Sequence, residues 1–272
     1  MPQETIKVIN NILNSTSIQG AWEELCEFMA SYGFDRMMYG RTHFADGFNL
    51  GDEQDYMVLS NHDPKYFDFF IRSGRFKRAP FFVWTFSNVG FISWSELAKL
   101  HLPDKIRSDA LKIVELNHSY GVVAGITASF SNSIKGHKSA ATICAKAGLS
   151  QGDVDRIWDE YHEILEVVWT AFDLKVKTLP FPSLRERLTV RQKEVLGWIA
   201  QGKTSKETAV IMQLSLATVE KHVRLAKETL NAHTVAQAIA KMSFLNQLIL
   251  DSDSERRIRD DFVEQPHLAG PI

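Results

Sequence analysis

Charged and hydroxyl side chains recur along residues 215–227, on a segment whose other face is apolar. Arg224 carries a guanidinium that can pair with guanine, and Glu220 can accept a hydrogen bond from the amino group of cytosine. Lysine and hydroxyl side chains near helix starts can bind phosphate oxygens. This segment and the one before it therefore have the chemistry to bind double-stranded DNA. The side chains expected at this interface are Lys203, Ser205, Lys206, Ser215, Thr218, Glu220, Lys221, His222, Arg224 and Lys227.

Short helices must hold these side chains, and residues 188–245 carry the start and stop signals for such helices. Thr189 and Thr204 are each followed three residues later by Gln or Glu, the form of a capping box that satisfies two otherwise unpaired backbone donors. Gly202 stands where the first of these helices would end in a left-handed residue. Ser215 is a good N-cap for the third helix. The stretch is predicted to form an all-α four-helix module with a helix-turn-helix at its centre, whose third helix enters the major groove.

The charge of this region differs from that of the whole chain. Residues 185–250 hold ten Lys and Arg against five Asp and Glu, a net charge of +5 within a chain of net charge −2. A basic patch of this kind is the electrostatic footprint of nucleic-acid binding. The alternative is a plain helical bundle with a solvated charged face. The order of caps, glycine, turn and basic third helix favours DNA binding.

The sequences GKTSKETA and TVEKHV in this region resemble the C-terminal domain of LuxR-type transcription regulators. The resemblance implies that Trp198, Glu220 and Arg224 approach DNA, and that the last helix, 234–246, joins two such domains in a homodimer. Dimeric helix-turn-helix proteins bind half-sites about 10 bp apart, or a multiple of that, so near-palindromic DNA is the expected partner. Gln192 departs from the family pattern, which has an acidic residue there, and a contact that needs a charge at this position is in doubt.

The length and composition of the chain limit the classes of protein to which it can belong. A chain of 272 residues, 44% of them hydrophobic, is long enough for about two domains with buried cores. It has no run approaching the ~18 apolar residues of a membrane span, and its start lacks the basic and apolar segments of a secretion signal. Two cysteines, Cys26 and Cys144, are too few for a disulfide framework. We expect a cytoplasmic protein with no metal or other cofactor, because the chain has no CxxC, HExxH or GxGxxG pattern.

Composition divides the chain into four parts. A ligand-sensing and dimerisation domain is expected over residues 1–174, and the DNA-binding domain over residues 188–250. The two prolines of KVKTLPFPSLRER place a linker at 175–187, since proline breaks helices and restricts the residue before it. Residues 251–272 are charged and carry little apolar surface, so a mobile tail is expected there.

Hydrophobic residues in the first part follow helical spacing in some segments and strand spacing in others, without regular alternation. This pattern favours an α+β fold, in which helices cover an antiparallel sheet, over a doubly wound parallel sheet. Aromatic residues crowd the stretch 66–94; most are expected to form a core, and some to line a cavity for an apolar small molecule. Helices are expected at 4–14, 18–32, 64–73, 104–119 and 150–174, and strands at 34–44, 55–60, 120–131 and 138–146.

This part of the chain resembles the autoinducer-binding domain of LuxR-type receptors, an α-β-α sandwich that binds acyl-homoserine lactones. The resemblance spans residues 20–175 and is carried by FISWSEL around Trp94, YGVVAGIT around Gly125, and Thr142. It implies that Trp94 contacts the lactone ring, that Gly125 forms a turn, and that the Thr142 hydroxyl lies near the ligand amide.

Other positions depart from the ligand contacts of that family. Pro80 stands at the end of the family's Asp-Pro pair, so Ala79 replaces an aspartate that accepts the amide N–H of the ligand. Tyr66 stands in place of a tryptophan, Phe70 in place of a tyrosine, and His62 in place of a second tyrosine. An amide N–H that is buried without an acceptor costs about 1–3 kcal/mol, which amounts to a tenfold loss in affinity or more.

Three hypotheses follow for the small molecule. The cavity binds a ligand other than an acyl-homoserine lactone; or it binds a lactone through a rearranged polar set that includes His62, Asp63 or Tyr66; or aromatic side chains fill it and the protein binds DNA without ligand. We favour the first, which makes the chain a DNA-binding transcriptional regulator controlled by a small molecule.

Two other classes of protein compete with this interpretation. A response regulator with a divergent receiver domain can carry the same C-terminal module, but FDRMMYG supplies one Asp where the receiver needs two acids. An enzyme fused to a DNA-binding domain needs a nucleophile or an acid–base pair. No Ser or Cys stands in a nucleophile context, and no catalytic residue is expected. The histidines of the first part are scattered, at His43, His62, His101, His118 and His137.

Overall fold

The fold was obtained as a computed structural model, whose described residues form two compact units, one built on Met1–Leu179 and one within Pro180–Asp260. The predicted tail at 251–272, and the predicted linker from residue 180 to 187, lie outside the described residues. The described residues are 2–47, 49–51, 53, 56–100, 104–132, 134, 136–179 and 188–244.

The N-terminal unit is built on a five-stranded sheet in the order β2-β1-β5-β4-β3. Each neighbouring pair of strands is antiparallel, as expected. A receiver domain has a parallel, doubly wound sheet, so this topology excludes the response-regulator alternative. The short edge strand β3 was not predicted, since four residues carry too little alternation to be recognised. The strands are β1 (Phe34–Thr42), β2 (Tyr56–Ser60), β3 (Gly90–Ser93), β4 (Gly125–Phe130) and β5 (Lys138–Ala145).

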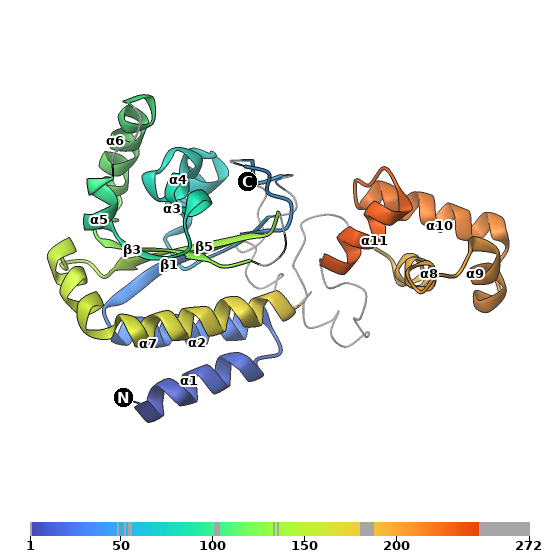
Figure 1. Ribbon diagram of the computed structural model, residues 1–272, viewed down its shortest axis with the longest axis horizontal. Coiled ribbons are helices and arrows are strands. Elements are labelled where there is room, and N and C mark those ends of the chain that lie inside the picture. The colour runs from blue at the N-terminus through green and yellow to red at the C-terminus, as the bar shows by residue number, and fades with distance from the viewer. Residues whose placement is uncertain are drawn as a thin grey trace. The chain divides into compact units, whose positions relative to one another are not determined.

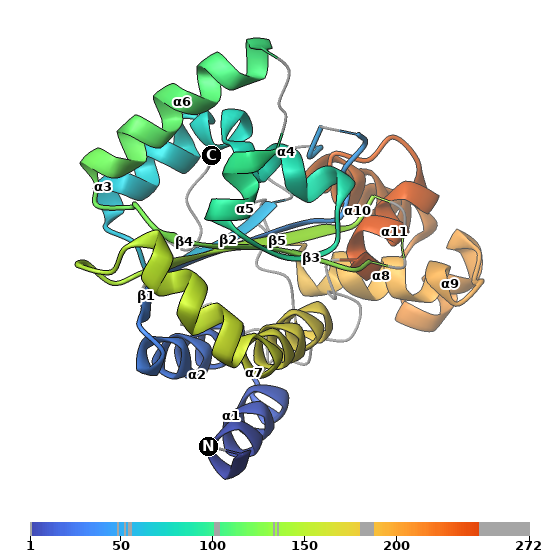
Figure 2. The same ribbon diagram turned by 60° about the vertical axis from the view of Figure 1, so that its left-hand side comes forward.

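Helices cover both faces of this sheet, which makes the unit an α-β-α sandwich (Figures 1 and 2). On one face lie α2 (Ile18–Ser31) and α7 (Gln151–Thr178), with α1 (Pro2–Asn14) packed against both. The other face is covered by α3 (Pro64–Phe67), α4 (Pro80–Ser87), α5 (Trp94–Lys99) and α6 (Asp104–Ser119). Among the described helices, none is long and apolar enough to cross a membrane.

The aromatic segment differs from the single helix predicted at 64–73. Only Pro64–Phe67 is α-helical; a π-helical turn follows over Asp68–Arg72, and a 3₁₀ turn over Arg75–Arg78. The π turn is closed by the backbone N–H of Ser73, which donates to the carbonyl of Asp68, five residues back. The helix α4 was not predicted, because its nearly uniform apolar sequence PFFVWTFS has no helical periodicity.

Helix α7 runs to Thr178, so the linker predicted from residue 175 begins too early. The physical reason is tertiary. Val176 is fully buried, its carbonyl accepts a hydrogen bond from Arg41 Nη1 at 3.1 Å, and Lys177 pairs with Asp173. These contacts hold the last turn of the helix against the sheet, and the helix ends at Thr178, two positions before Pro180 in the sequence.

A buried polar network joins α7 to the sheet. The carboxylate of Asp173, 2% exposed, accepts hydrogen bonds from Tyr39 Oη at 2.9 Å and from Ser139 Oγ at 2.6 Å. Its second oxygen lies 2.5 Å from Lys177 Nζ, which also donates to the carbonyl of Ser131. Burial and the adjacent carboxylate of Asp173 raise the pKa of Tyr39, which keeps its hydroxyl a donor. The network fixes which residues of α7 face β1 and β5.

The C-terminal unit is all-α over its described residues, in agreement with the predicted helix-turn-helix module. Both capping boxes form, at Thr189 and at Thr204, and Ser215 caps the third helix. Gly202 has the positive φ of +87° expected for a left-handed C-terminal residue, and Gln213 takes the same region in the turn. The helices are α8 (Val190–Ala200), α9 (Ser205–Met212), α10 (Leu216–Thr229) and α11 (Val235–Phe244).

Candidate functional site

Helix α10 presents one polar face to solvent and packs the other into its unit. Val219, Ala226 and Leu230 are buried, while Glu220, Lys221 and Arg224 are exposed. The 3.6-residue period of the helix produces this separation. Arg224 Nη1 lies 2.8 Å from Glu228 Oε1, four residues on. An exposed pair of this kind is weak, so the guanidinium can leave its partner for a base or a phosphate.

The side chains at the start of α10 serve the helix itself. Ser215 Oγ accepts from the backbone N–H of Thr218 at 3.1 Å and lies 2.8 Å from the hydroxyl of Thr218. Lys227 Nζ lies 3.5 Å from the carbonyl of His233, beyond the other end of the helix. His222 is half-buried beside the exposed row. Arg224 and Glu220 thus stay the strongest candidates for contacting bases.

The neighbouring helices contribute the remaining predicted side chains. Lys203 and Lys206 are exposed around the start of α9, where Ser205 is half-buried. Unpaired backbone donors and the helix dipole at such a start attract phosphate. Trp198 is half-buried in the last turn of α8.

The first cavity of the N-terminal unit lies between the sheet and α4 and has a volume of about 100 Å³. Its walls come from the sheet strands β1, β2 and β5, from the π turn, from the 3₁₀ turn and from α4. The lining is almost entirely apolar and aromatic, and Phe70 and Thr142, two of the predicted ligand residues, take part in it. Other lining residues include Met38, Val58, Phe76, Phe81, Phe82 and Lys138.

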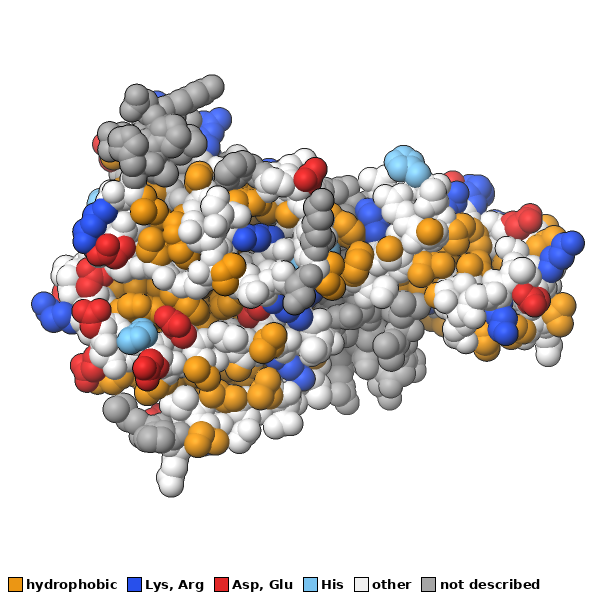
Figure 3. Space-filling view, in the orientation of Figure 1, with side chains coloured by type: hydrophobic (Ala, Val, Ile, Leu, Met, Phe, Trp, Pro, Cys, Tyr) orange, Lys and Arg blue, Asp and Glu red, His pale blue; other side chains and the backbone are white. Residues whose placement is uncertain are grey.

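The second cavity, of about 400 Å³, lies among α4, α5 and α6. Pro80 and Trp94 line it, as do Asn117 and His118. Several of its apolar residues reach the surface; Leu111 is 59% exposed, and Figure 3 shows hydrophobic side chains at the surface beside these helices. Phe81 lines both cavities, so its ring is part of the wall between them.

Trp94 and Gly125 pack against each other. The indole N–H of Trp94 donates to Thr127 Oγ1 at 3.0 Å. Gly125 is the first residue of β4 and not part of a turn, which corrects the role expected for it. A Cβ built on it would lie 3.1 Å from Trp94 Cζ2 and 2.5 Å from the carbonyl oxygen of Ile143, so only glycine admits this packing.

Tyr66 and Ala79 line neither cavity. The hydroxyl of Tyr66 donates to Asn117 Oδ1 at 3.2 Å, and its ring stacks on Phe70 at 5.3 Å between centroids. Ala79 is fully buried and stands at the N-cap of α4, where it gives no side-chain hydrogen bond. The position for which the resemblance predicts a family aspartate is therefore both a helix start and part of the aromatic core.

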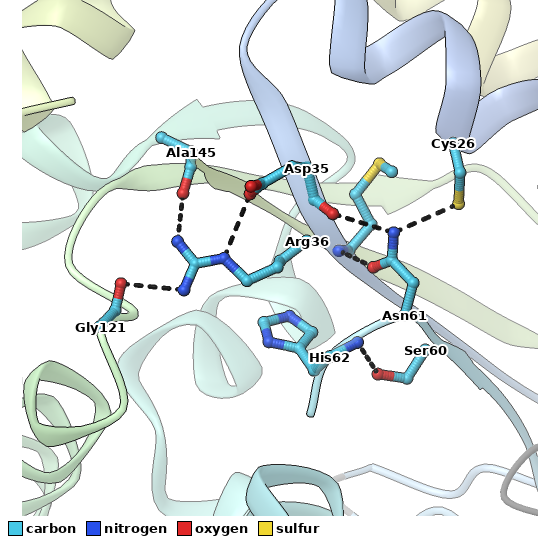
Figure 4. A network of polar contacts seen from close by, with 9 residues as sticks. Cys26, Asp35, Arg36, Ser60, Asn61, His62, Gly121 and Ala145 are labelled. Atoms are coloured by element: carbon cyan, nitrogen blue, oxygen red, sulfur yellow. Dashed lines mark hydrogen bonds and ion pairs between the residues drawn. The ribbon is translucent and has the colours of Figure 1, made fainter. Parts of the chain in front are cut away.

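His62 also lies away from the cavities, next to a polar network at the start of β1 (Figure 4). Arg36 donates to the carbonyls of Gly121 and Ala145 and pairs with Asp35. The imidazole of His62 is 7% exposed, and its ring lies 4.8 Å from that of Tyr66. Among the described residues, none gives its Nε2 atom a hydrogen bond. Burial, and then the charge of Arg36, lower the pKa of His62 to about 3.

This low pKa predicts acid sensitivity of the N-terminal unit. The unfolded chain protonates His62 near pH 6.5, whereas the folded chain does so only near pH 3, so stability falls as pH falls through this window. Between pH 7 and pH 4.5 this residue alone should cost about 2.5 kcal/mol. His62→Phe keeps the ring against Tyr66 and should remove that part of the loss.

Urea unfolding at a series of pH values measures the effect. His162→Asn, at an exposed position on α7, is the matched control and should follow the wild-type pH profile. Parallel pH profiles for the wild type and His62→Phe would contradict the assignment.

Three residues at the cavities were not singled out from the sequence. Phe81 was counted among the core aromatics, and Asn117 and Lys138 stand in no motif. Strand alternation could have placed Lys138 on the same face as Thr142, since the two are four residues apart on β5. Nothing in the sequence brings Asn117 next to Tyr66, because that contact joins segments 51 residues apart.

Comparison with known proteins gives two domain matches. The model of the autoinducer binding domain matches residues 17–176, and that of bacterial regulatory proteins of the luxR family matches residues 186–242. The HTH-type quorum sensing-dependent transcriptional regulator RpaR of Rhodopseudomonas palustris is 41% identical over 68 residues, 25% of this chain and 28% of that protein. The transcriptional activator protein BjaR1 of Bradyrhizobium diazoefficiens is 41% identical over 64 residues, 22% of this chain and 26% of that protein. The matched stretch thus spans little more than a quarter of either relative.

Among solved structures, the crystal structure of Escherichia coli SdiA matches this chain. It is 15% identical to this chain, with a TM-score of 0.49, and the match covers 90% of this chain and 98% of that chain.

Proposed function

The chain belongs to the family that joins an autoinducer-binding domain to a luxR-type DNA-binding domain, and we propose that it is a transcriptional regulator controlled by a small molecule. It acts by binding rather than by catalysis, in the cytoplasm. The observation that carries the proposal is the face of α10, which exposes Glu220, Lys221 and Arg224 from a helix anchored by its buried side.

The DNA contacts divide into base readers and phosphate anchors. Arg224 and Glu220 stand on the exposed face of the third helix, the element that enters the major groove in helix-turn-helix proteins. Lys203 and Lys206, at the start of α9, are placed to bind phosphate. A homodimer joined through α11 would present two copies of α10 to a near-palindromic site. Binding of the chain to random-sequence DNA pools, followed by selection, tests this; recovery of no enriched site would contradict it.

Replacing Arg224 with alanine should cost about 1–3 kcal/mol in binding to the selected site, because a bidentate contact to guanine is lost. Binding to scrambled DNA should change much less. Titration of both DNAs at two salt concentrations measures the difference.

Lys206→Ala is the matched control for Arg224→Ala. It should weaken the two DNAs alike and lower the salt slope by about 1, as expected for one lost phosphate contact. If the wild type and Arg224→Ala discriminate equally between selected and scrambled DNA, Arg224 does not contribute to base recognition.

We infer that the small molecule occupies the first cavity. Its wall is mostly apolar and comes from both the sheet and α4, so a ligand there would stabilise the fold of the whole unit. An acyl-homoserine lactone is disfavoured, since Phe70, which lines this cavity, offers no hydroxyl where the family resemblance places a tyrosine. The small volume, compared with the about 300–1,000 Å³ of common ligand pockets, also supports a second candidate, a regulator that needs no ligand.

Thermal unfolding with a panel of acyl-homoserine lactones separates these candidates. A ligand at a hundred times its dissociation constant stabilises the folded state by about 2.7 kcal/mol. Stabilisation of the wild type by a lactone would favour a rearranged lactone site. Stabilisation of Ala79→Asp alone would favour an intact cavity tuned to another molecule, and no response in either would favour regulation without a lactone.

A further inference from the structure

The first cavity holds one cationic side chain at its edge. Lys138 is the first residue of β5 and pairs across the sheet with Thr42, so the two side chains stand on the same face. That face also carries Gly40, Ala140 and Thr142, and all of them line the cavity. Lys138 is half-buried at the end of this row, with its ammonium 5.9 Å from the ring centroid of Phe86.

No described carboxylate forms an ion pair with this ammonium. Two of the hydroxyls that line the same cavity are already engaged: Thr42 Oγ1 donates to the carbonyl of Leu50 at 2.8 Å, and Thr85 Oγ1 to that of Phe82 at 2.7 Å. Burial lowers the pKa of Lys138, which indicates that its lost hydration is not replaced. An aromatic ring offsets a small part of that loss, whereas an anion would offset much more.

Arg41 does not provide a second anchor for an anion. Although it belongs to the cavity wall, its side chain stands on the opposite face of β1, like that of Tyr39, and its Nη1 atom bonds to the carbonyl of Val176 on α7. The cavity therefore combines an apolar, aromatic body with a single positive charge at one end.

We propose that the first cavity binds a small apolar carboxylate, with its carboxylate on Lys138 and its hydrocarbon part among Phe70, Phe76 and Phe82. The inference rests on the proposed function, in which this cavity is the ligand site, and it names the ligand class. The volume of about 100 Å³ sets the size of the hydrocarbon part. Since a cavity of about 150 Å³ holds benzene, a body of about five or six carbon atoms is the upper limit without widening of the cavity.

Hexanoate and hexanamide test the proposal, because they share a hydrocarbon chain and differ in charge. Their affinities for the full-length protein at pH 7 can be measured by ligand-observed NMR titration. Hexanoate should bind at least about tenfold more tightly than hexanamide, as expected for a charge-assisted hydrogen bond in a half-buried site. Lys138→Met should abolish the preference, and Lys138→Arg, which keeps the charge, should retain it. Lys146→Met, at an exposed lysine just after β5, is the control and should behave as the wild type.

Each other outcome overturns the proposal in a distinguishable way. Equal binding of both compounds, with no effect of Lys138→Met, would show a cavity that ignores charge and would leave the proposed function intact. Absence of binding by the wild type would exclude small carboxylates as ligands, while the DNA titrations test the regulator independently. A Lys138→Met protein that loses stability without ligand would assign Lys138 to the fold, since a ligand-pairing lysine should be neutral to stability or cost some.

Discussion

Replacing Asp173 with alanine is expected to lower the free energy of unfolding of the N-terminal unit by about 3 kcal/mol. The substitution takes the Asp173 acceptor away from the Tyr39 and Ser139 hydroxyls and removes one partner of the Lys177 ammonium. Removing one member of a buried, hydrogen-bonded ion pair is among the costlier changes to a fold. The Ser131 carbonyl, which also accepts from Lys177, keeps the loss near the lower end of the usual range.

Urea unfolding of the full chain, followed by tryptophan fluorescence, measures this loss, since five of the six tryptophans lie in the N-terminal unit. Asp173→Asn keeps an acceptor and should lose less than Asp173→Ala. Asp159→Ala removes an exposed carboxylate from the same helix and should change stability by less than about 0.5 kcal/mol. Similar losses for Asp159→Ala and Asp173→Ala would mean that the buried network contributes nothing specific.

Replacing Gly125 with alanine is expected to destabilise the N-terminal unit by about 1–3 kcal/mol, the usual cost of overpacking. The added methyl would meet the Ile143 carbonyl oxygen at 2.5 Å. That carbonyl belongs to β5, which pairs with β4 in a fixed register, and the side chain of Gln151 bonds to both the N–H and the carbonyl of Gly125. The register and the Gln151 bonds oppose a shift of the strand away from this carbonyl. The methyl would also lie 3.1 Å from Trp94 Cζ2, so the indole must move as well.

Gly40→Ala is the matched control, because Gly40 lies in β1 of the same sheet and a Cβ there would meet nothing within 4 Å. It should be neutral or raise stability by about 0.5 kcal/mol, since alanine reduces the freedom of the unfolded chain. The Trp94 fluorescence should change in Gly125→Ala and not in Gly40→Ala. A stable Gly125→Ala protein with unchanged fluorescence would show that the glycine is not required by the indole.

The C-terminal unit could be predicted almost entirely from the sequence. Its caps are local devices: Thr189 and Thr204 bond to residues three positions away, and Gly202 ends a helix through its own backbone conformation. The apolar stripe of α10 follows from the period of the helix alone. Interactions within one or two turns do not depend on what the rest of the chain does, so the third helix and its exposed Arg224 followed from the order of the residues.

In the N-terminal unit, the sequence determined the fold class and the tertiary structure decided the site. Of the predicted ligand residues, Phe70 and Thr142 line the first cavity, Pro80 and Trp94 line the second, and the others line neither. The composition of the aromatic stretch fits a hydrophobic core and a ligand pocket equally well. The tertiary structure shows which of its residues line a cavity, and Phe81 lines both.

Lys138, Asn117 and Asp173 became visible as parts of a site or of the core only when distant strands and helices met. Sequence fixes which side chains are available and the local geometry of each element. Whether a polar group ends beside a partner, beside a cavity or in solvent depends on contacts between residues far apart in the chain. The net free energy of those contacts is a small difference between the gain from burying apolar surface and the cost of desolvating polar groups. Both amounts depend on the complete fold.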